Sequence, residues 1–95
     1  MPKAKPRTRR TQQERSDATQ LALLDATIAC MTRDGYAGTS ISTIVEEAGV
    51  SRGALLHHFP TKNELIAHAI YHFYAQRLAR FKKQLIGATT DKLSL

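Results

Sequence analysis

The stretch that decides the fold reads Glu47-Ala48-Gly49-Val50-Ser51-Arg52-Gly53-Ala54-Leu55-Leu56-His57-His58-Phe59. Its centre predicts a tight turn, because Gly49 accepts the left-handed backbone that reverses a chain. Val50 is an apolar residue inside that turn, and Ser51 is a good cap for a following helix. Two short helices joined by a turn that contains glycine form a helix-turn-helix motif.

The helix before the turn is predicted from apolar residues that recur at helical spacing. They share one face, with Thr39 or Ser40 as the cap. The helix after the turn covers about residues 51–59, because proline prevents its continuation at Pro60. The apolar residues of the first helix are Ile41, Ile44, Val45 and Ala48.

The second of these helices has two different sides. At about 100° per residue, Leu55 and Phe59 point together toward a core. The opposite side carries Gly53 and His57, with Arg52 on the first turn. Small side chains let a helix approach a DNA groove closely, and a few donors read base edges. The alternative is an ordinary polar surface, but glycine facing water would stabilise nothing, so the groove is favoured.

Two longer helices are predicted on either side of the motif. A capping box over residues 11–14 begins the first at Thr11, with Ser16 as a rival start, and Gly35 ends it. A second capping box over residues 61–64 begins the other, which we expect to end at Gly87. The expected buried stripe of the first helix is Leu21, Leu24, Ile28 and Met31.

These patterns predict an all-α protein: a homeodomain-like three-helix bundle with a helix-turn-helix, followed by a long fourth helix. We expect a disordered basic arm over 1–10, the bundle over 11–60, the long fourth helix over 61–87, and a short final segment over 88–95. The last segment looks like the opening of a fifth helix. The long fourth helix carries more apolar side chains than the bundle can cover. Those beyond its reach are Phe73, Tyr74, Leu78, Phe81 and Leu85.

The net charge of +6 is concentrated at the beginning of the chain. Residues 1–15 hold six of the fourteen basic residues and one of the eight acidic residues. A basic arm is attracted to a polyanion, although charge alone is equally compatible with a solvated tail. The motifs that follow favour nucleic acid.

From Leu24 to Leu65 the chain resembles the TetR family of transcriptional regulators. The resemblance implies a DNA-binding head that reads the major groove of an inverted-repeat operator, and mostly a repressor. It implies that the fourth helix links the head to a ligand-binding body, so that residues 88–95 are the start of a truncated ligand-binding region. It also implies a homodimer once a full-length body is present, and a small-molecule effector bound by that body. The stretches that carry it are Leu24-Asp25-Ala26, Asp34-Gly35-Tyr36, Thr39-Ser40-Ile41, Glu47 to Leu55, and His58-Phe59-Pro60-Thr61-Lys62-Asn63-Glu64-Leu65.

The resemblance also implies roles for single residues. Ser40, Ser42 and Lys62 match positions that face phosphates. The residues that match groove-facing positions are Arg52, Gly53, Ala54 and His57. Leu56 stands where the family usually has tyrosine, so we expect contact with a thymine methyl instead of a phosphate hydrogen bond. The predicted DNA-binding residues are Ser40, Ser42, Ser51, Arg52, Gly53, Ala54, Leu56, His57, His58 and Lys62.

Two other classes of function compete with DNA binding. An enzyme is not expected: His68 and His72 have a zinc-like spacing, but a zinc site needs a third ligand, so no catalytic residue, metal or cofactor is predicted. Cys30 fits a small core residue and a reducing cytoplasm, where we expect the chain. A protein-interaction module stays open, because the exposed apolar residues need a partner. Membrane attachment is not expected, because the arm lacks an apolar face.

Overall fold

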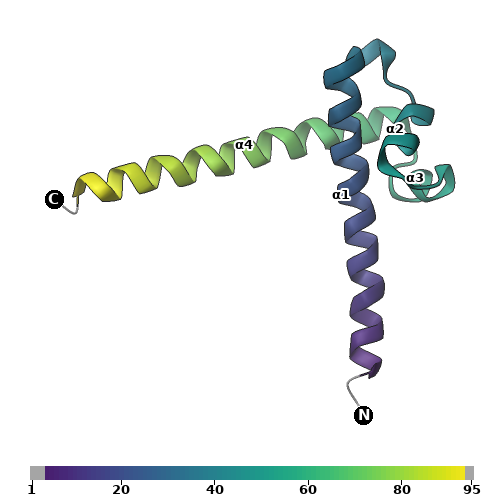
Figure 1. Cartoon of the computed structure of the whole chain (residues 1–95), viewed down its shortest axis with the longest axis horizontal. Helices are drawn as coiled ribbons and strands as arrows, with labels where there is room; N and C mark the ends of the chain where they lie inside the picture. Colours follow the sequence, from purple (N-terminus) through teal and green to yellow (C-terminus); the bar gives the residue numbers. More distant parts are fainter. Residues whose placement is uncertain (1–3, 94–95) are drawn as a thin grey trace.

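The structure is a computed structural model that describes the backbone of residues 4–93 and the side chains of residues 11–88. Within these residues the chain forms helices α1 (Ala4–Gly38), α2 (Ile41–Ala48), α3 (Arg52–His58) and α4 (Lys62–Leu93). The two long helices cross each other, and the two short helices pack beside the crossing (Figure 1). The all-α prediction, with a helix-turn-helix and a long fourth helix, is confirmed.

The core lies where α1 crosses the other helices, and each helix contributes to it. Leu55 and Phe59 are buried, as the helical projection predicted, and Cys30 is a buried core residue. The hydroxyl of the buried Thr27 donates to the carbonyl of Leu23 at 2.7 Å, so this polar group is satisfied. The fully buried side chains are Leu23, Thr27 and Cys30 of α1, Thr39 before α2, Ile44 of α2, Leu55 of α3, and Leu65 and Ala69 of α4.

The predicted stripe of α1 is wrong at one end. Leu21 is 49% exposed, whereas Leu23 is fully buried. The reason is that α1 packs against α2 and also against α4, so its buried surface is wider than one stripe and is centred on different residues. Leu24 is buried as predicted, and Ile28 packs partly buried against the core.

The residues that bound the helix-turn-helix are those that the sequence predicted. The helical backbone of α1 breaks at Gly35, with φ 76° and ψ 172°, a conformation nearly restricted to glycine. Ser40 caps α2, and Gly49 ends it in the left-handed conformation with φ 70°. Ser51 caps α3, and Phe59 ends it just before Pro60. These positions fix the helix-turn-helix.

The long helices extend further than predicted. Helix α1 begins at Ala4, not at Thr11 or Ser16, so the backbone of residues 4–10 is helical rather than disordered. Pro6 is compatible with this because the amides of a first turn lack helical partners in any case. Gly87 does not end α4, and residues 88–93 continue it instead of opening a fifth helix. One glycine costs only about 1 kcal/mol inside a helix.

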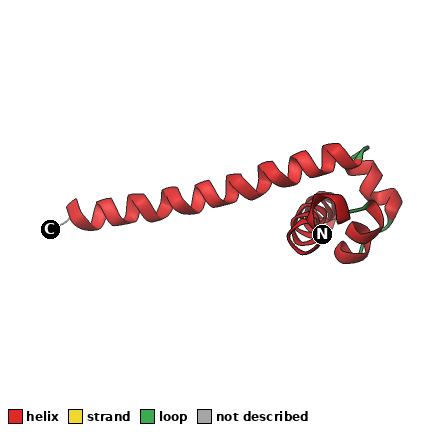
Figure 2. Cartoon of the chain, turned by 90° about the horizontal axis from the view of Figure 1, so that it is seen from above, coloured by secondary structure: helices red, strands yellow, loops and turns green. Residues whose placement is uncertain are grey.

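The molecule consists of a small head, which we define as residues 23–69, and two projecting helices. Its radius of gyration is 17.9 Å, against about 12 Å for a compact domain of this length. The outer half of α4 stands clear of the other helices (Figure 2). Among the described residues, no helix combines the length and apolar character needed to cross a membrane.

Candidate nucleic-acid interface

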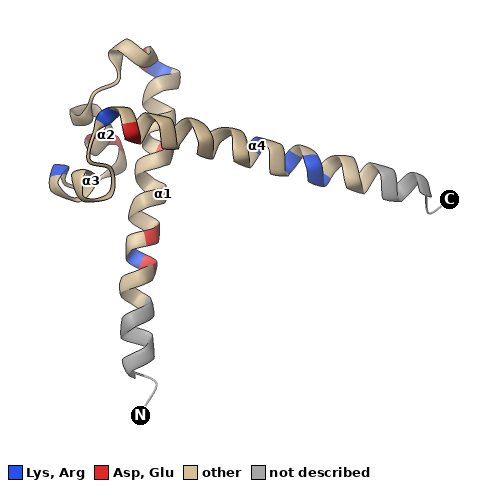
Figure 3. Cartoon of the chain, turned by 180° about the vertical axis from the view of Figure 1, so that it is seen from behind, with Lys and Arg blue, Asp and Glu red and all other residues tan. Residues whose placement is uncertain are grey.

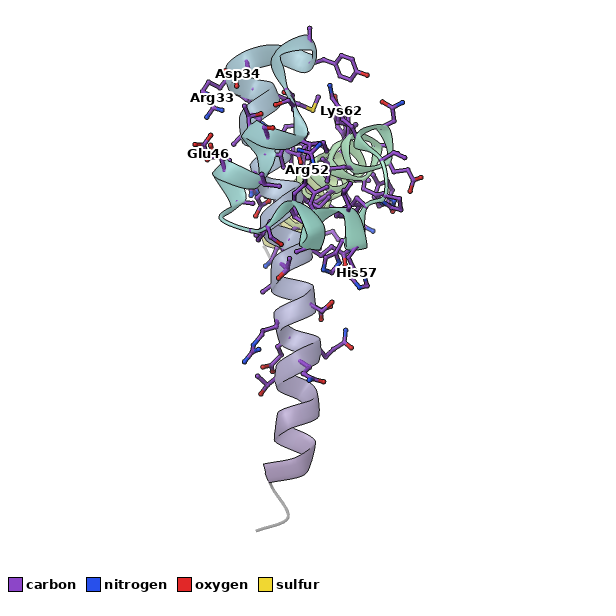
Figure 4. The ribbon with its side chains drawn as sticks, turned by 90° about the vertical axis from the view of Figure 1, so that its right-hand side faces the viewer. Arg33, Asp34, Glu46, Arg52, His57 and Lys62 are labelled. Carbon is purple, nitrogen blue, oxygen red and sulfur yellow. The ribbon has the colours of Figure 1, made fainter. Side chains whose placement is uncertain are left out.

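Helix α3 presents one side to the core and the other to solvent. Leu55 and Phe59 are buried, whereas Arg52 and His57 are exposed and Leu56 is 40% exposed. His57 points away from the core of the head (Figure 4). The other predicted residues of this helix are Ser51 and Gly53, which are exposed, and Ala54 and His58, which are half-buried.

Nothing in the fold of the head requires glycine at position 53. Its φ angle is not positive, and a Cβ atom added there would approach only the Ser51 hydroxyl, at 4.0 Å. Glycine is nevertheless about 1 kcal/mol less favourable than alanine inside a helix. A glycine that the head does not require, on the solvent side of α3, fits a surface that another molecule approaches closely.

Two hydroxyl groups at the start of α2 take part in its cap, and a third is exposed. Ser40 and Thr43 form a reciprocal capping box: the Ser40 hydroxyl accepts from the Thr43 amide at 3.2 Å, and the Thr43 hydroxyl accepts from the Ser40 amide at 3.1 Å. Ser42 is exposed. Ser51 is engaged in the same way, because its hydroxyl accepts from the Ala54 amide at 3.0 Å. Ser42 is therefore the better candidate for a phosphate contact.

Lys62 lies at the start of α4, beside the exposed end of α1. Its ammonium group is 5.3 Å from the centre of the Tyr36 ring, a distance typical of a cation–π contact. The Thr61 hydroxyl accepts from the Glu64 amide at 3.1 Å, which confirms Thr61 as the cap of α4. A helix N-terminus and a lysine together favour an anion. The sequence analysis placed Tyr36 in a stretch that carries the resemblance but gave it no role in the site, because its contact with Lys62 joins two separate helices.

Charged residues divide the head into two sides. In Figure 4, Lys62 and His57 lie on one side of the head, and Arg33, Asp34 and Glu46 lie on the other. Basic segments appear at the start of α3 and at the start of α4 (Figure 3). Lys62 and His57 therefore lie apart from Asp34 and Glu46, whereas Arg52 lies between the two groups in Figure 4 and the exposed Glu64 follows Lys62 in the first turn of α4.

Arg33 of α1 forms an exposed ion pair with Glu47 of α2. One of its guanidinium nitrogens lies 3.1 Å from a carboxylate oxygen of Glu47, and another lies 3.0 Å from Asp34. The hydrogen bonds that the Arg33 guanidinium donates to the carboxylates of Asp34 and Glu47 raise the pKa of Arg33 above its ordinary value. No spacing in the sequence signals the pair of Arg33 with Glu47, which spans two helices.

The remaining histidines lie at the junction between the head and α4. The His68 ring packs 5.4 Å from the Phe59 ring, centre to centre, and His72 Nε2 lies 3.4 Å from Asp25 Oδ1. Within the described residues, no three His, Cys, Asp or Glu side chains gather as metal ligands would. His68 thus packs against Phe59, whereas the buried His72 Nε2 faces the Asp25 carboxylate without a hydrogen bond, and the expectation of no metal stays a prediction.

Comparisons with known proteins agree with this geometry. A family model described as "Bacterial regulatory proteins, tetR family" matches residues 23–74. The HTH-type transcriptional regulator CymR of Pseudomonas putida is 44% identical over 77 residues, which are 81% of this chain and 38% of CymR. An HTH-type transcriptional regulator of Mycobacterium bovis is 38% identical over 86 residues, which are 90% of this chain and 44% of that protein.

The chain thus spans 38% to 44% of the length of these curated relatives. No solved structure gives a significant match. The matched residues 23–74 contain all of α2 and α3 and are more than half of the chain. The chain therefore belongs to the TetR family of bacterial regulatory proteins, and its relatives are helix-turn-helix regulators of transcription.

Proposed function

We propose that this chain binds a specific operator in double-stranded DNA, with α3 in the major groove, and acts as a repressor. The observation that supports this most directly is the division of α3. Leu55 and Phe59 anchor one side in the core, while Arg52, Gly53 and His57 lie exposed on the rest of the helix. A helix fixed in this way presents its donors in a constant orientation to base edges.

The proposal gives the exposed residues of α3 different tasks. Arg52 is the best base-reading group, because arginine bonded through two nitrogens to guanine is the commonest specific contact. His57 supplies a second polar group, and Leu56 meets a thymine methyl. Gly53 and Ala54 allow the helix to approach the bases. Half-buried His58 lies at the edge of this surface.

Phosphate contacts would hold α3 in register. Ser42 offers an exposed hydroxyl, and the Ser40 and Ser51 hydroxyls contribute chiefly as helix caps. Lys62 and the first amides of α4 supply a positive site for one phosphate. Such contacts position the protein but carry no sequence information.

The proposal extends to the assembly. Two heads on an inverted repeat require a homodimer, with half-sites about 34 Å apart. In the whole protein an effector would bind outside the described residues and change operator affinity. A regulator of this kind acts on chromosomal DNA, so the proposed location is the cytoplasm. The relatives are regulators, and we propose a regulator here rather than an enzyme.

A binding selection from randomised duplexes tests the proposal with wild type, Arg52→Ala and Lys62→Ala. Arg52→Ala should weaken binding to the selected site by about 1–3 kcal/mol and relax the preference at one base position. Lys62→Ala should weaken binding to all sequences alike, because it removes a phosphate contact.

Each outcome of this selection has a distinct meaning. Identical base preferences in wild type and Arg52→Ala would remove Arg52 from the set of reading residues. A wild type that selects no sequence would contradict base reading by α3 and leave only attraction to a polyanion. Circular dichroism of each variant controls for folding, and both substituted side chains lie outside the buried core.

A further inference from the structure

Three aromatic rings form a row that runs from the core of the head to the surface of α3. Phe59 is 3% exposed, His58 is half-buried, and His57 is exposed. The ring centres of Phe59 and His58 lie 6.4 Å apart, and those of His58 and His57 lie 5.5 Å apart. The two imidazole rings meet edge to face, an arrangement that aromatic pairs favour. The row therefore connects the His57 ring to the core through His58.

The ring nitrogens of His57 are open to another molecule. The side chain points away from the core of the head (Figure 4). Its one polar or aromatic contact with a described residue is the ring contact with His58, which uses no hydrogen bond. An exposed imidazole that a neighbouring ring supports, and that no carboxylate engages, has both nitrogens free for a ligand of the solvent side of α3.

The charged groups of the head leave His57 without a carboxylate partner. No ion pair of the described residues includes it. Asp34 and Glu46 lie on the other side of the head, whereas Lys62 lies on the same side as His57 (Figure 4). Acceptors for the N–H groups of His57 therefore come from a bound molecule. The other charged or histidine side chains of the head are Asp25 and Arg33 of α1, Glu47 of α2, Arg52 and His58 of α3, and Glu64 and His68 of α4.

We propose that binding of double-stranded DNA takes up a proton at His57, and that His58 positions the ring that receives it. This inference rests on the proposed function, because it requires α3 to lie against DNA. A neutral imidazole has one N–H group, whereas the protonated ring has two and carries a positive charge. A duplex presents acceptors to such a ring, namely phosphate oxygens along the groove and the N7 and O6 atoms of guanine within it.

The proton and the DNA are then coupled in both directions. If the proton tightens DNA binding by some factor, DNA tightens proton binding by the same factor. Histidine changes its charge between about pH 5 and 8, so the coupling falls in this range. Affinity for DNA should be about two- to fivefold higher at about pH 6 than at about pH 8, the effect of one exposed charge pair. The gain disappears as the pH rises, because His57 then binds DNA in its neutral form.

Calorimetric titration of the full chain with the duplex recovered by selection measures the proton directly. In buffers of different ionisation enthalpy at about pH 7, wild type should take up a fraction of one proton for each bound chain. His57→Gln should lose this uptake and the difference in affinity between the two pH values. His68→Gln is the matched control, because His68 is an exposed histidine that packs on the same Phe59 ring from α4. Uptake that persists in His57→Gln, or that disappears in His68→Gln, would overturn the assignment to His57.

Variants of His58 separate the positioning role from titration of His58 itself. His58→Phe keeps a ring beside His57 and should keep the proton uptake. His58→Ala removes the ring and should reduce the uptake, since His57 loses its orientation. Loss of the uptake in His58→Phe would show that His58 receives the proton, which contradicts the proposal. Circular dichroism of each variant controls for folding.

A random duplex separates the two kinds of acceptor. Contact with a phosphate should give the same pH effect on selected and random duplexes, and a salt slope steeper by up to about 0.9 at the lower pH. Contact with guanine should confine the effect to the selected duplex, and either result supports proton uptake at His57. DNA binding that does not change with pH would overturn this inference and leave the proposed function intact. Absence of DNA binding at both pH values would overturn the proposed function, and this inference with it.

Discussion

Tyr36 shows how a single exposed residue connects the ends of two helices. It is 58% exposed at the end of α1, yet its ring lies 5.3 Å from the ammonium of Lys62 at the start of α4. The contact restricts Lys62 to one region near the α4 N-terminus, where the proposed phosphate would bind. An exposed cation–π contact is worth about 0.5–1 kcal/mol.

We expect Tyr36→Ala to lower affinity for all DNA sequences by about two- to fivefold, because Lys62 loses its orientation. Tyr36→Phe should bind like wild type, since it retains the ring. The measurement is fluorescence anisotropy with specific and random duplexes. In a Lys62→Ala background, Tyr36→Ala should have no further effect. An equal loss in both backgrounds would mean that Tyr36 acts independently of Lys62.

At the scale of elements, α3 combines a firm attachment with an unfavourable residue. Its seven residues are held by the Ser51 cap, by Leu55 and by Phe59. Gly53 weakens the helix, although the surrounding space would accept a larger side chain. In the proposed complex, stability of the element and close approach to a groove therefore oppose each other at this position.

Gly53→Ala should stabilise the head by up to about 1 kcal/mol in urea unfolding, because alanine favours the helix. The same variant should weaken operator binding by about 1–3 kcal/mol, comparable to one mismatched base pair, since the added methyl group separates helix and bases.

Gly87→Ala is the matched control for this pair of effects. It also lies in a helix with open space around it, but far from the proposed interface. It should leave DNA affinity unchanged while favouring the helix. If Gly53→Ala binds DNA as tightly as wild type, the small surface of α3 does not contact the groove.

At the scale of the whole molecule, the proposed function assigns the directional contacts to the head and sequence-independent attraction to the basic arm. The side chains of residues 1–10 lie outside the described residues, so the role of the arm stays a prediction from the sequence. Helix α1 begins at Ala4, which connects that segment directly to the head. Attraction between a basic segment and DNA acts on every sequence equally and weakens with salt.

Replacing Lys3, Lys5, Arg7, Arg9 and Arg10 by glutamine should weaken binding to specific and random DNA to the same extent. The slope of log affinity against log salt should fall by about 0.9 for each phosphate that the arm no longer neutralises. Glutamine replacement of Arg77, Arg80, Lys82 and Lys83 on α4 is the control, and should alter the slope less. Unchanged affinity and slope in the arm variant would mean that the arm is only a tail.

The sequence by itself determined the helix-turn-helix and the candidate surface of α3. Gly49, Ser51 and Pro60 act on their own backbone or on residues a few positions away, so their effects are readable without the fold. The inward side of α3 also followed from spacing alone. Local signals were insufficient at Gly87, because one unfavourable residue does not end a long helix.

The tertiary structure decided what depends on which helices meet. Leu21 is exposed and Leu23 is buried because α1 packs against both α2 and α4, which no helical period specifies. Tyr36 meets Lys62, and Arg33 meets Glu47, only because the turns bring helix ends together. Contacts between residues distant in sequence arise from the packing of whole helices. The free energy of that packing depends on several helices at once, so no pattern within one helix predicts these contacts.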